Sequence, residues 1–271
     1  MSTTARGSRL EAEAEALRFE NVSLQFPGGA RPAVRDVSFS VQRGKFVAVI
    51  GPSGCGKSTL LNLAAGLLAP SLGAVYFGGE PVTSVNSAAA YVTQKANLLP
   101  WLSVRGNIGL ALRLRRMPKA EREQRIAQWV GRVGLEGFED YFPRELSGGM
   151  QKRCAIARAL IYDPSIVLMD EPFGPLDAMT RLELQQELLN LWEQQRGTLV
   201  FVTHDLNEAI YLADEVVVMS EGPGTVRRIL PVPFPRPRVI GSLVESPEFA
   251  ELYQELWSLF TSGHAVSGAT V

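Results

Sequence analysis

KFVAVIGPSGCGKST, residues 45–59, sets the fold class of this chain. KFVAVI is a nearly continuous apolar run, which is typical of a short strand buried on both faces of a parallel sheet. A glycine-rich turn follows, and the segment STLLNLAAGLL at 58–68 is apolar almost all round, as in a buried helix. With a strand before it and a helix after it, the pattern G-x-x-x-x-G-K-S predicts a phosphate-binding loop.

The composition of this loop suits a nucleoside triphosphate. Glycines let backbone N–H groups wrap the phosphates, and the N-terminal end of the following helix attracts the same anion. We expect Lys57 to bridge the β- and γ-phosphates, Ser58 to hold Mg²⁺, and Thr59 to approach the α-phosphate. The candidate residues are Gly51, Pro52, Ser53, Gly54, Cys55, Gly56, Lys57, Ser58 and Thr59. The flanking strand and helix disfavour the alternative, a chance glycine-rich turn.

A pair of carboxylates follows a second apolar strand, in IVLMDEP at 166–172. The apolar residues place Asp170 at the carboxyl end of that strand, where open α/β sheets bind ligands. We expect Asp170 to reach Mg²⁺ through water. Glu171 is the candidate general base that polarises an attacking water. A solvated acidic turn is the alternative interpretation.

Strand-like and helical segments alternate outside these motifs. Strand patterns occupy 17–42, 74–79, 88–94, 165–170, 198–205 and 215–220, and helical patterns occupy 97–163 and 182–195. Such alternation predicts a parallel sheet covered by helices. The Pro- and Arg-rich segment 222–239 is predicted to be extended. A short helix is expected over 246–260, with Ser246 as its N-cap and Pro247 at its first position.

Composition excludes several classes of protein. The 271 residues are 46% hydrophobic, enough for a core, and carry a net charge of −1, which disfavours nucleic acid as the main partner. The two cysteines lack metal-ligand spacing and indicate a reducing cytosol. Residues 1–16 are Glu-rich, unlike a secretory signal, and are predicted to be a disordered leader. Without an apolar run of about 18 residues, nothing is expected to span a membrane.

A second anion-binding turn is predicted in LSGGMQKR, residues 146–153. Ser147 suits an N-cap, and Gly148 and Gly149 leave backbone N–H groups open to a phosphate. The helix that follows is expected to run to about Asp163, before Pro164. Because one phosphate-binding loop is already present, we expect this turn to bind the nucleotide of a second copy packed head to tail, with two-fold symmetry.

GPSGCGKST, LSGGMQ and IVLMDEP, in this order, resemble the Walker A, signature and Walker B motifs of the ATP-binding cassette (ABC) family. The resemblance covers roughly 17–230 and implies an ATPase. The implied fold is α/β, a P-loop NTPase core with a parallel sheet, an antiparallel β subdomain at the N-terminus and an inserted α-helical subdomain at about 97–163. Residues 231–271 then form a C-terminal extension with a short helix.

Further positions take roles only through this resemblance. Gln94 in YVTQ is similar to the Q-loop glutamine, which contacts Mg²⁺ and the attacking water and couples to a membrane partner. Asp177 in FGPLD is similar to the D-loop aspartate at the dimer interface, although Pro175 replaces the usual small residue and implies a stiffer loop. His204 in VTHD matches the histidine that contacts the γ-phosphate. Phe26 lies where the family stacks an aromatic ring on adenine, and an ordinary core position is the alternative.

The chain also resembles a particular type of cassette. It has one cassette and no fused membrane domain, as in the stand-alone ATPase subunits of multi-chain importers. The segments 97–108, 169–181 and 230–238 resemble the nitrate/sulfonate/taurine/bicarbonate group. Apolar residues beside the Q-loop are candidates for docking a permease helix, with packing within the helical subdomain as the alternative; they are Leu98, Leu99 and Trp101.

This resemblance implies a set of partners and a location. The partners are a second copy of the chain, integral membrane permease subunits and an external solute-binding protein, with no nucleic acid, at the cytoplasmic face of the inner membrane. The alternatives are a soluble ABC ATPase with a nucleic-acid or regulatory role, an ABC transporter for another cargo, and a P-loop kinase for a small metabolite. A kinase would leave LSGGMQKR and Glu171 unexplained.

Overall fold

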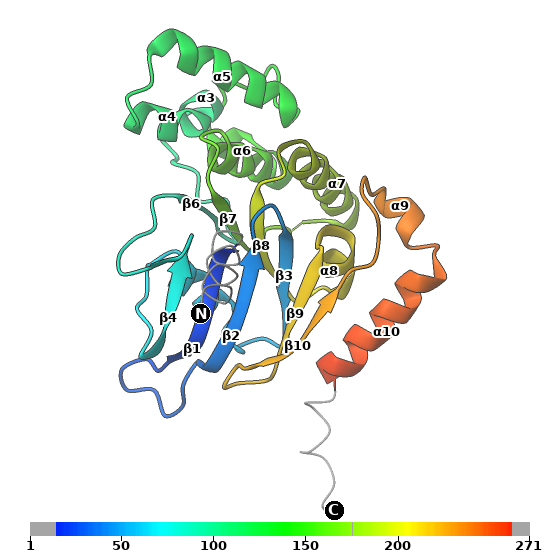
Figure 1. Ribbon diagram of the computed structural model, residues 1–271. Helices are drawn as coiled ribbons and strands as arrows, with labels where there is room; N and C mark the ends of the chain where they lie inside the picture. Colours follow the sequence, from blue (N-terminus) through cyan, green and yellow to red (C-terminus); the bar gives the residue numbers. More distant parts are fainter. Residues whose placement is uncertain (1–14, 175, 262–271) are drawn as a thin grey trace, which may run out of the picture. The chain divides into compact units, whose positions relative to one another are not determined.

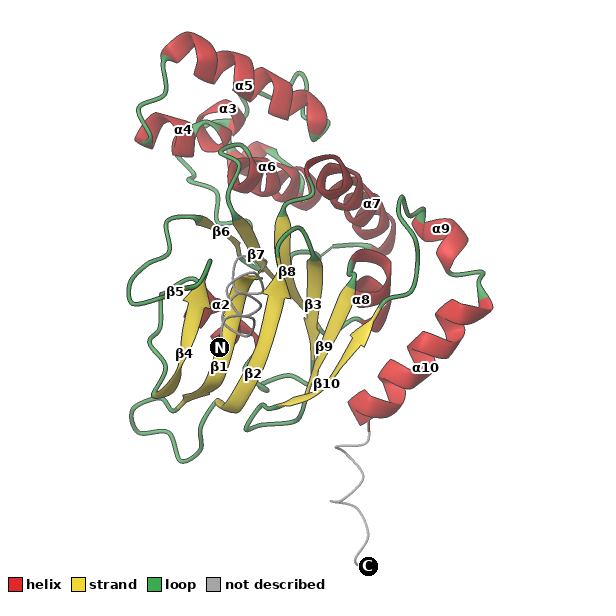
Figure 2. Ribbon diagram, viewed as in Figure 1, coloured by secondary structure: helices red, strands yellow, loops and turns green. Residues whose placement is uncertain are grey.

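The computed structural model describes residues 15–174 and 176–261. The chain divides into two compact units, one made of the segments before residue 88 and after residue 195, the other of residues 88–195. Figures 1 and 2 show their helices and strands. Each unit combines strands and helices, as the alternation of patterns predicts.

Parallel strands form the centre of the first unit. The strand β3 (Phe46–Ile50) pairs in parallel with β8 (Thr198–Thr203) on one side and with β9 (Glu215–Met219) on the other. Beyond β9, β10 (Val226–Pro231) runs antiparallel. Every residue of β3 is buried, because neighbouring strands occupy both of its edges and side chains cover both of its faces. The predicted strand of KFVAVI is thereby confirmed.

The N-terminal part of the first unit is an antiparallel sheet with the strand order β2-β1-β4-β5. These strands are β1 (Glu15–Leu24), β2 (Val34–Gln42), β4 (Leu72–Phe77) and β5 (Glu80–Pro81). The antiparallel β subdomain is as expected, and β4 joins it beside β1. The first strand includes the last two residues of the expected leader, and residues 1–14 lie outside the described part.

Among its described residues, the first unit has the helices α2 (Lys57–Ala64), α8 (Leu206–Leu212), α9 (Ile240–Leu243) and α10 (Pro247–Thr261). The Oγ atom of Ser246 accepts a hydrogen bond from the backbone N–H of Phe249 at 3.2 Å, which confirms the predicted cap of α10. The Phe249 ring stacks on Tyr211 of α8, with 5.5 Å between ring centroids. The buried face of α10 therefore fastens the C-terminal extension to the first unit.

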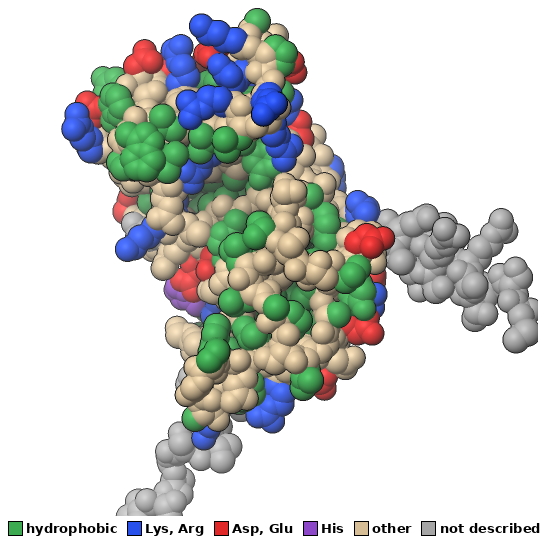
Figure 3. Space-filling view, turned by 90° about the vertical axis from the view of Figure 1, so that its left-hand side faces the viewer, with side chains coloured by type: hydrophobic (Ala, Val, Ile, Leu, Met, Phe, Trp, Pro, Cys, Tyr) green, Lys and Arg blue, Asp and Glu red, His purple; other side chains and the backbone are tan. Residues whose placement is uncertain are grey.

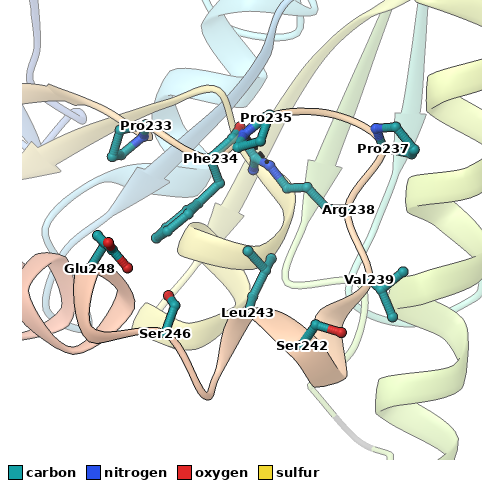
Figure 4. Close-up of a pocket in the computed structure, with 10 residues that line it drawn as sticks. All are labelled: Pro233, Phe234, Pro235, Pro237, Arg238, Val239, Ser242, Leu243, Ser246 and Glu248. Carbon is teal, nitrogen blue, oxygen red and sulfur yellow. Dashed lines mark hydrogen bonds between the residues drawn. The ribbon is translucent and has the colours of Figure 1, made fainter.

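Two arginines attach the Pro-rich segment before α9. Arg236 donates hydrogen bonds to Oδ1 of Asp214, which also accepts one at Oδ2 from the backbone N–H of Phe46 in β3. Arg238 is almost fully buried and donates to backbone carbonyls, including that of Ala213 at 2.7 Å. Figure 4 shows its guanidinium beside Phe234, whose carbonyl accepts at 2.9 Å, at the edge of a hollow of about 510 Å³.

The second unit combines two parallel strands with a group of helices. The strands are β6 (Ala89–Val92) and β7 (Ile166–Asp170). The helices are α3 (Val104–Ile108), α4 (Leu110–Leu114), α5 (Lys119–Arg132), the 3₁₀ turn η1 (Pro143–Glu145), α6 (Gly148–Leu160) and α7 (Ala178–Gln195). The helical character predicted for 97–163 corresponds to α3 through α6. Across the described residues, no helix has the length and apolarity that a membrane crossing requires.

Prolines set two helix boundaries in this unit. The helical pattern around residues 111–135 is divided between α4 and α5, because Pro118 stands at the N-cap of α5. The predicted end of α6 at about Asp163 is wrong by a few residues, since the helix ends at Leu160. Pro164 disfavours helical geometry at the residue before it, and Asp163 has a φ of +50°.

Candidate functional site

Two positive-φ glycines shape the loop between β3 and α2. Gly54 has a φ of +79° and Gly56, the N-cap of α2, a φ of +91°. A Cβ on Gly56 would lie 2.4 Å from Cγ1 of Val34, whereas a Cβ on Gly54 would meet nothing within 4 Å. The loop thus packs against β2 at Gly56 and faces open space at Gly54, as a phosphate cradle requires.

Lys57 and Cys55 have different places in this loop. The Lys57 side chain arches back, and its Nζ atom donates to the carbonyls of Gly51 at 2.7 Å and Pro52 at 3.0 Å. This places a buried positive charge over the loop, where it would meet phosphate oxygens. The Cys55 side chain is buried, and burial raises the pKa of its thiol although Lys57 acts to lower it. Cys55 therefore contributes packing and its backbone rather than a reactive sulfur.

His204 and Phe26 belong to the same unit as the loop. The pairing of Ile50 with Thr203 places His204, just beyond the end of β8, level with the start of the loop. His204 is exposed. Asp205 caps α8 immediately after it by accepting from the N–H of Asn207 at 2.8 Å. Phe26 is 46% exposed in the turn between β1 and β2, so it is not a core residue.

The second unit gathers the candidate carboxylates and Gln94. Asp170 ends β7, and the pairing of Val92 with Met169 brings the residues just after β6 to the same end of the strand pair. A Cβ on Gly174 would lie 3.3 Å from Nε2 of Gln94, so this amide contacts the turn after β7. That turn is closed by a hydrogen bond from the N–H of Gly174 to the carbonyl of Glu171 at 3.2 Å.

Glu171 and Asp170 show signs of a specialised environment. Glu171 has a φ of +42°, an uncommon conformation for a residue with a side chain and one that clusters at functional sites. Burial and the nearby charge of Asp170 both raise the pKa of Tyr91 in β6. Both carboxylates are half-buried. The three residues predicted to act on water and Mg²⁺ in this unit therefore lie at one end of the strand pair.

The predicted signature turn has the expected geometry. The Oγ atom of Ser147 accepts from the N–H of Met150 at 3.3 Å, and α6 begins at Gly148. Ser147 and Gly148 are exposed, whereas Gly149 is buried. A Cβ on Gly149 would lie 2.7 Å from Cγ2 of Thr180, so only glycine lets α6 approach α7 so closely. Ser147 and Gly148 therefore lie at the surface, at the N-terminal end of α6.

Asp177 has a local structural role that the sequence reasoning missed. Its Oδ1 atom accepts from the N–H of Thr180 at 3.0 Å, just before the start of α7. Hydrogen bonds from the backbone and side chain of Thr180 lower the pKa of its carboxyl. The fully exposed carboxylate therefore acts as an N-cap. Pro175, whose stiffening of this loop was expected, lies outside the described residues.

A buried lysine in α6 was also missed. Lys152 is 3% exposed, and burial lowers its pKa to about 8. Its Nζ atom donates to the backbone carbonyls of Thr93 and Gln94, with 3.2 Å to the first. The signal in the sequence is that helical spacing places Lys152 on the same face as the apolar residues Ala155, Ile156 and Ala159. Burial of such a charge requires partners, which pattern reasoning cannot identify.

Comparison with known proteins gives consistent matches. The family model described as ABC transporter matches residues 34–174. The chain is 46% identical to the nitrate import ATP-binding protein NrtD of Synechococcus elongatus, over 88% of this chain and 89% of that protein. It is 43% identical to an aliphatic sulfonates import ATP-binding protein, SsuB, of Bacillus cereus, over 85% and 89%. The dimeric post-hydrolysis structure of the ATP-binding cassette MJ0796, bound to ADP and Pi, has a TM-score of 0.71 at 32% identity, over 80% of this chain and 98% of that one.

Proposed function

Because this chain belongs to the ABC transporter family, we propose that it is the ATP-hydrolysing subunit of a multi-chain importer for a small anion such as nitrate or a sulfonate. The observation that carries this proposal is the exposed, N-capped turn at Ser147 in a chain that also has a complete phosphate-binding loop. An enzyme that acted as a single copy would need one such turn only. The names of the nitrate and sulfonate import relatives support the class of cargo.

The residues fit ATP and Mg²⁺. The open space at Gly54 and the uncapped start of α2 suit the phosphates. Ser58, Asp170 and Gln94 would hold Mg²⁺, which would neutralise charge on the phosphate oxygens. Among the described residues, no group of three His, Cys, Asp or Glu side chains could by itself hold a metal ion.

Different side chains take different roles in ATP hydrolysis. Glu171 orients the attacking water and accepts its proton, and Gln94 positions the same water. Lys57 stabilises the charge that develops on the transferred phosphoryl group, and His204 donates to its oxygens. Phe26 stacks on the adenine, because its exposed ring is available to a base.

A second copy completes each site. Ser147, Gly148 and Gly149 of one molecule bind the phosphates held by the loop of the other, and Asp177 lies at the interface between them. ATP therefore closes a head-to-tail dimer, which hydrolysis reopens. The dimeric cassette with ADP and Pi among the related structures supports this arrangement. Asp177 can serve the interface while its Oδ1 atom caps α7.

The remaining partners are membrane permeases and an external solute-binding protein, which place the subunit at the cytoplasmic face of the inner membrane. The docking surface that we assign to the permease surrounds Trp101, which is 69% exposed and follows the Q-loop residue Gln94 by seven positions in the chain. The turn beside it adds the exposed aromatics Phe138, Tyr141 and Phe142. Figure 3 shows hydrophobic side chains gathered among lysines and arginines on the helical part of the molecule. Exposed aromatics of this kind mark protein–protein interfaces.

Two measurements test the proposal. Glu171→Gln should slow ATP hydrolysis by at least about a hundredfold, the lower range for loss of a general base, and should trap an ATP-bound dimer in light scattering. Rapid turnover by this variant would remove Glu171 as the base. Tagged protein purified from detergent-solubilised membranes should carry a multi-span permease in roughly equal amount. Recovery of soluble partners alone would move the assignment to a soluble ABC ATPase.

A further inference from the structure

Consecutive side chains in the first two turns of α6 each bind a different backbone segment. Nε2 of Gln151 donates to the carbonyls of Pro143 at 2.9 Å and Leu146 at 3.2 Å. These carbonyls belong to the chain that leads directly into Ser147. Gln151 therefore fixes the signature turn to the helix that follows it.

The next side chain, Lys152, reaches the segment after β6. Its ammonium donates to the carbonyls of Thr93 and Gln94, as described above. Because the donor is an ammonium group, both hydrogen bonds are charge-assisted. Lys152 thereby holds the backbone of Gln94 to α6. It directly follows Gln151, the residue that holds the signature turn.

A second cation of α6 continues the attachment. Arg158 donates to the carbonyl of Ala96 at 3.0 Å and to that of Asn97 at 2.9 Å. Within the segment, Nδ2 of Asn97 donates to Oγ1 of Thr93 at 2.8 Å. Segment 93–97 is therefore closed on itself and bound to one helix through four of its carbonyls.

Arg153, the third side chain of the series, fixes α6 within its unit. It donates to the carbonyl of Val133 at 3.2 Å, just after α5, and forms an ion pair with Glu187 of α7 at 2.5 Å. Helix α6, to which Lys152 and Gln151 attach segment 93–97 and the signature turn, is thus anchored to its neighbours α5 and α7.

We propose that Lys152 is a positioning residue that makes segment 93–97 and the signature turn 147–149 one rigid body. A displacement of Gln94, whether by nucleotide or by a docked permease, would then carry Ser147 with it. The inference rests on the proposed function, because it concerns how the ATPase site and the second-copy surface move together.

Stability of the fold does not explain a lysine at this position. Burial of an ammonium opposes folding, and replacement of buried ion pairs by apolar residues of similar volume is often neutral or stabilising. Methionine could occupy the same space without binding the carbonyls. Lys152→Met should therefore keep the fold while it releases segment 93–97, an outcome that a purely structural role does not predict.

The experiment compares variants of the full chain in the Glu171→Gln background. These are Lys152→Met, Lys152→Arg as the conservative rescue, and Lys95→Met as a control that removes an exposed lysine from the same segment. The measurements are the melting temperature, amide hydrogen exchange over 93–99 and 147–151, ATP affinity at concentrations where the chain is monomeric, and the dimer dissociation constant with ATP.

Lys152→Met should keep a cooperative melting transition, at most a few degrees below that of the parent, because two carbonyls lose their donor. The monomer's ATP affinity should match that of the parent. The variant should speed exchange in both segments, and weaken the dimer, by about tenfold or more, the change expected for lost hydrogen bonds to a charged group. Lys152→Arg should return the exchange rates and the dimer dissociation constant most of the way to the values of the parent. Lys95→Met should match the parent in both.

Unchanged exchange and dimerisation in Lys152→Met would overturn the proposal. If the Glu171→Gln parent itself forms no dimer with ATP, the proposed function fails, and exchange in the two segments still decides whether Lys152 joins them. If Lys152→Met does not fold, Arg158→Gln is measured in its place, because it removes the bonds to Ala96 and Asn97. Exchange over 93–99 at the parent rate in that variant would equally overturn the attachment.

Discussion

Replacement of Gly56 by alanine should separate two costs of building the phosphate-binding loop. The new Cβ would meet Cγ1 of Val34 at 2.4 Å and the carbonyl oxygen of Ala33 at 2.8 Å, so backbone must shift. Residue 56 also has a φ of +91°, outside the ordinary range for alanine. The backbone conformation costs roughly 1–2 kcal/mol and the overpacking about 1–3 kcal/mol. The total expected loss of folding free energy is about 2–5 kcal/mol.

Gly137→Ala provides the matched control. Gly137 has a φ of +84°, and a Cβ there would meet nothing within 4 Å, so this variant carries the conformational cost alone. Urea denaturation of both variants gives the two free energies of unfolding. Their difference should equal the overpacking cost, about 1–3 kcal/mol. Equal losses in the two variants would refute the argument that contact with β2 requires glycine at position 56.

Gly54→Ala tests the loop's open side. This variant should resemble Gly137→Ala in stability, because a Cβ at Gly54 also meets nothing within 4 Å, yet it should weaken ATP binding if phosphates occupy that space. Binding can be measured by calorimetry with the monomer. Unchanged ATP affinity would place the phosphates elsewhere along the loop.

Further predictions concern the cores of the two units and their titration. Trp129→Ala should cost about 3–5 kcal/mol of unfolding free energy, since Trp129 of α5 is 2% exposed. Ser246→Ala should cost about 1 kcal/mol of unfolding free energy. It should also speed amide exchange at Phe249, whose N–H donates to the Ser246 hydroxyl. Burial raises the pKa of Cys154 from 9.0 to about 12, so between these values the unfolded chain releases a proton that the folded chain keeps, and stability falls as pH rises. Relative to Cys154→Ala, the wild type should lose about 1.4 kcal/mol of unfolding free energy between pH 7 and 10. Urea denaturation at each pH measures this, and the same pH dependence in both proteins would contradict it.

Local patterns in the sequence anticipated elements whose stability is local. Strand β3 and the helix N-caps at Ser147 and Ser246 were all predicted. A continuous apolar run favours a buried strand, and a side-chain oxygen just before an apolar helical pattern favours an N-cap, whatever the rest of the chain does. Short elements escaped prediction. The α8 helix has only seven residues, too few for a clear period, and Asp205 alone marks its start.

Burial separated residues that the sequence could not distinguish. Phe26 lies in an amphipathic pattern that suits a core position equally well, and only the fold leaves its ring 46% exposed. Cys55, inside the glycine-rich motif, packs its side chain away from solvent. Asp177 was expected at an interface and also caps α7, a hydrogen bond that depends on where that helix begins.

The sequence by itself determined the chemistry: a phosphate-binding loop, an Asp-Glu pair after an apolar strand and a second glycine turn are readable because each is contiguous in the chain. Only the tertiary structure decided how distant segments are held. In the sequence, Lys152 is only one charged residue of a predicted helix. The fold brings the carbonyls of Thr93 and Gln94 within hydrogen-bonding distance of its ammonium. Contacts between residues almost sixty positions apart leave no pattern in the chain, because they form only when burial brings the backbone groups together.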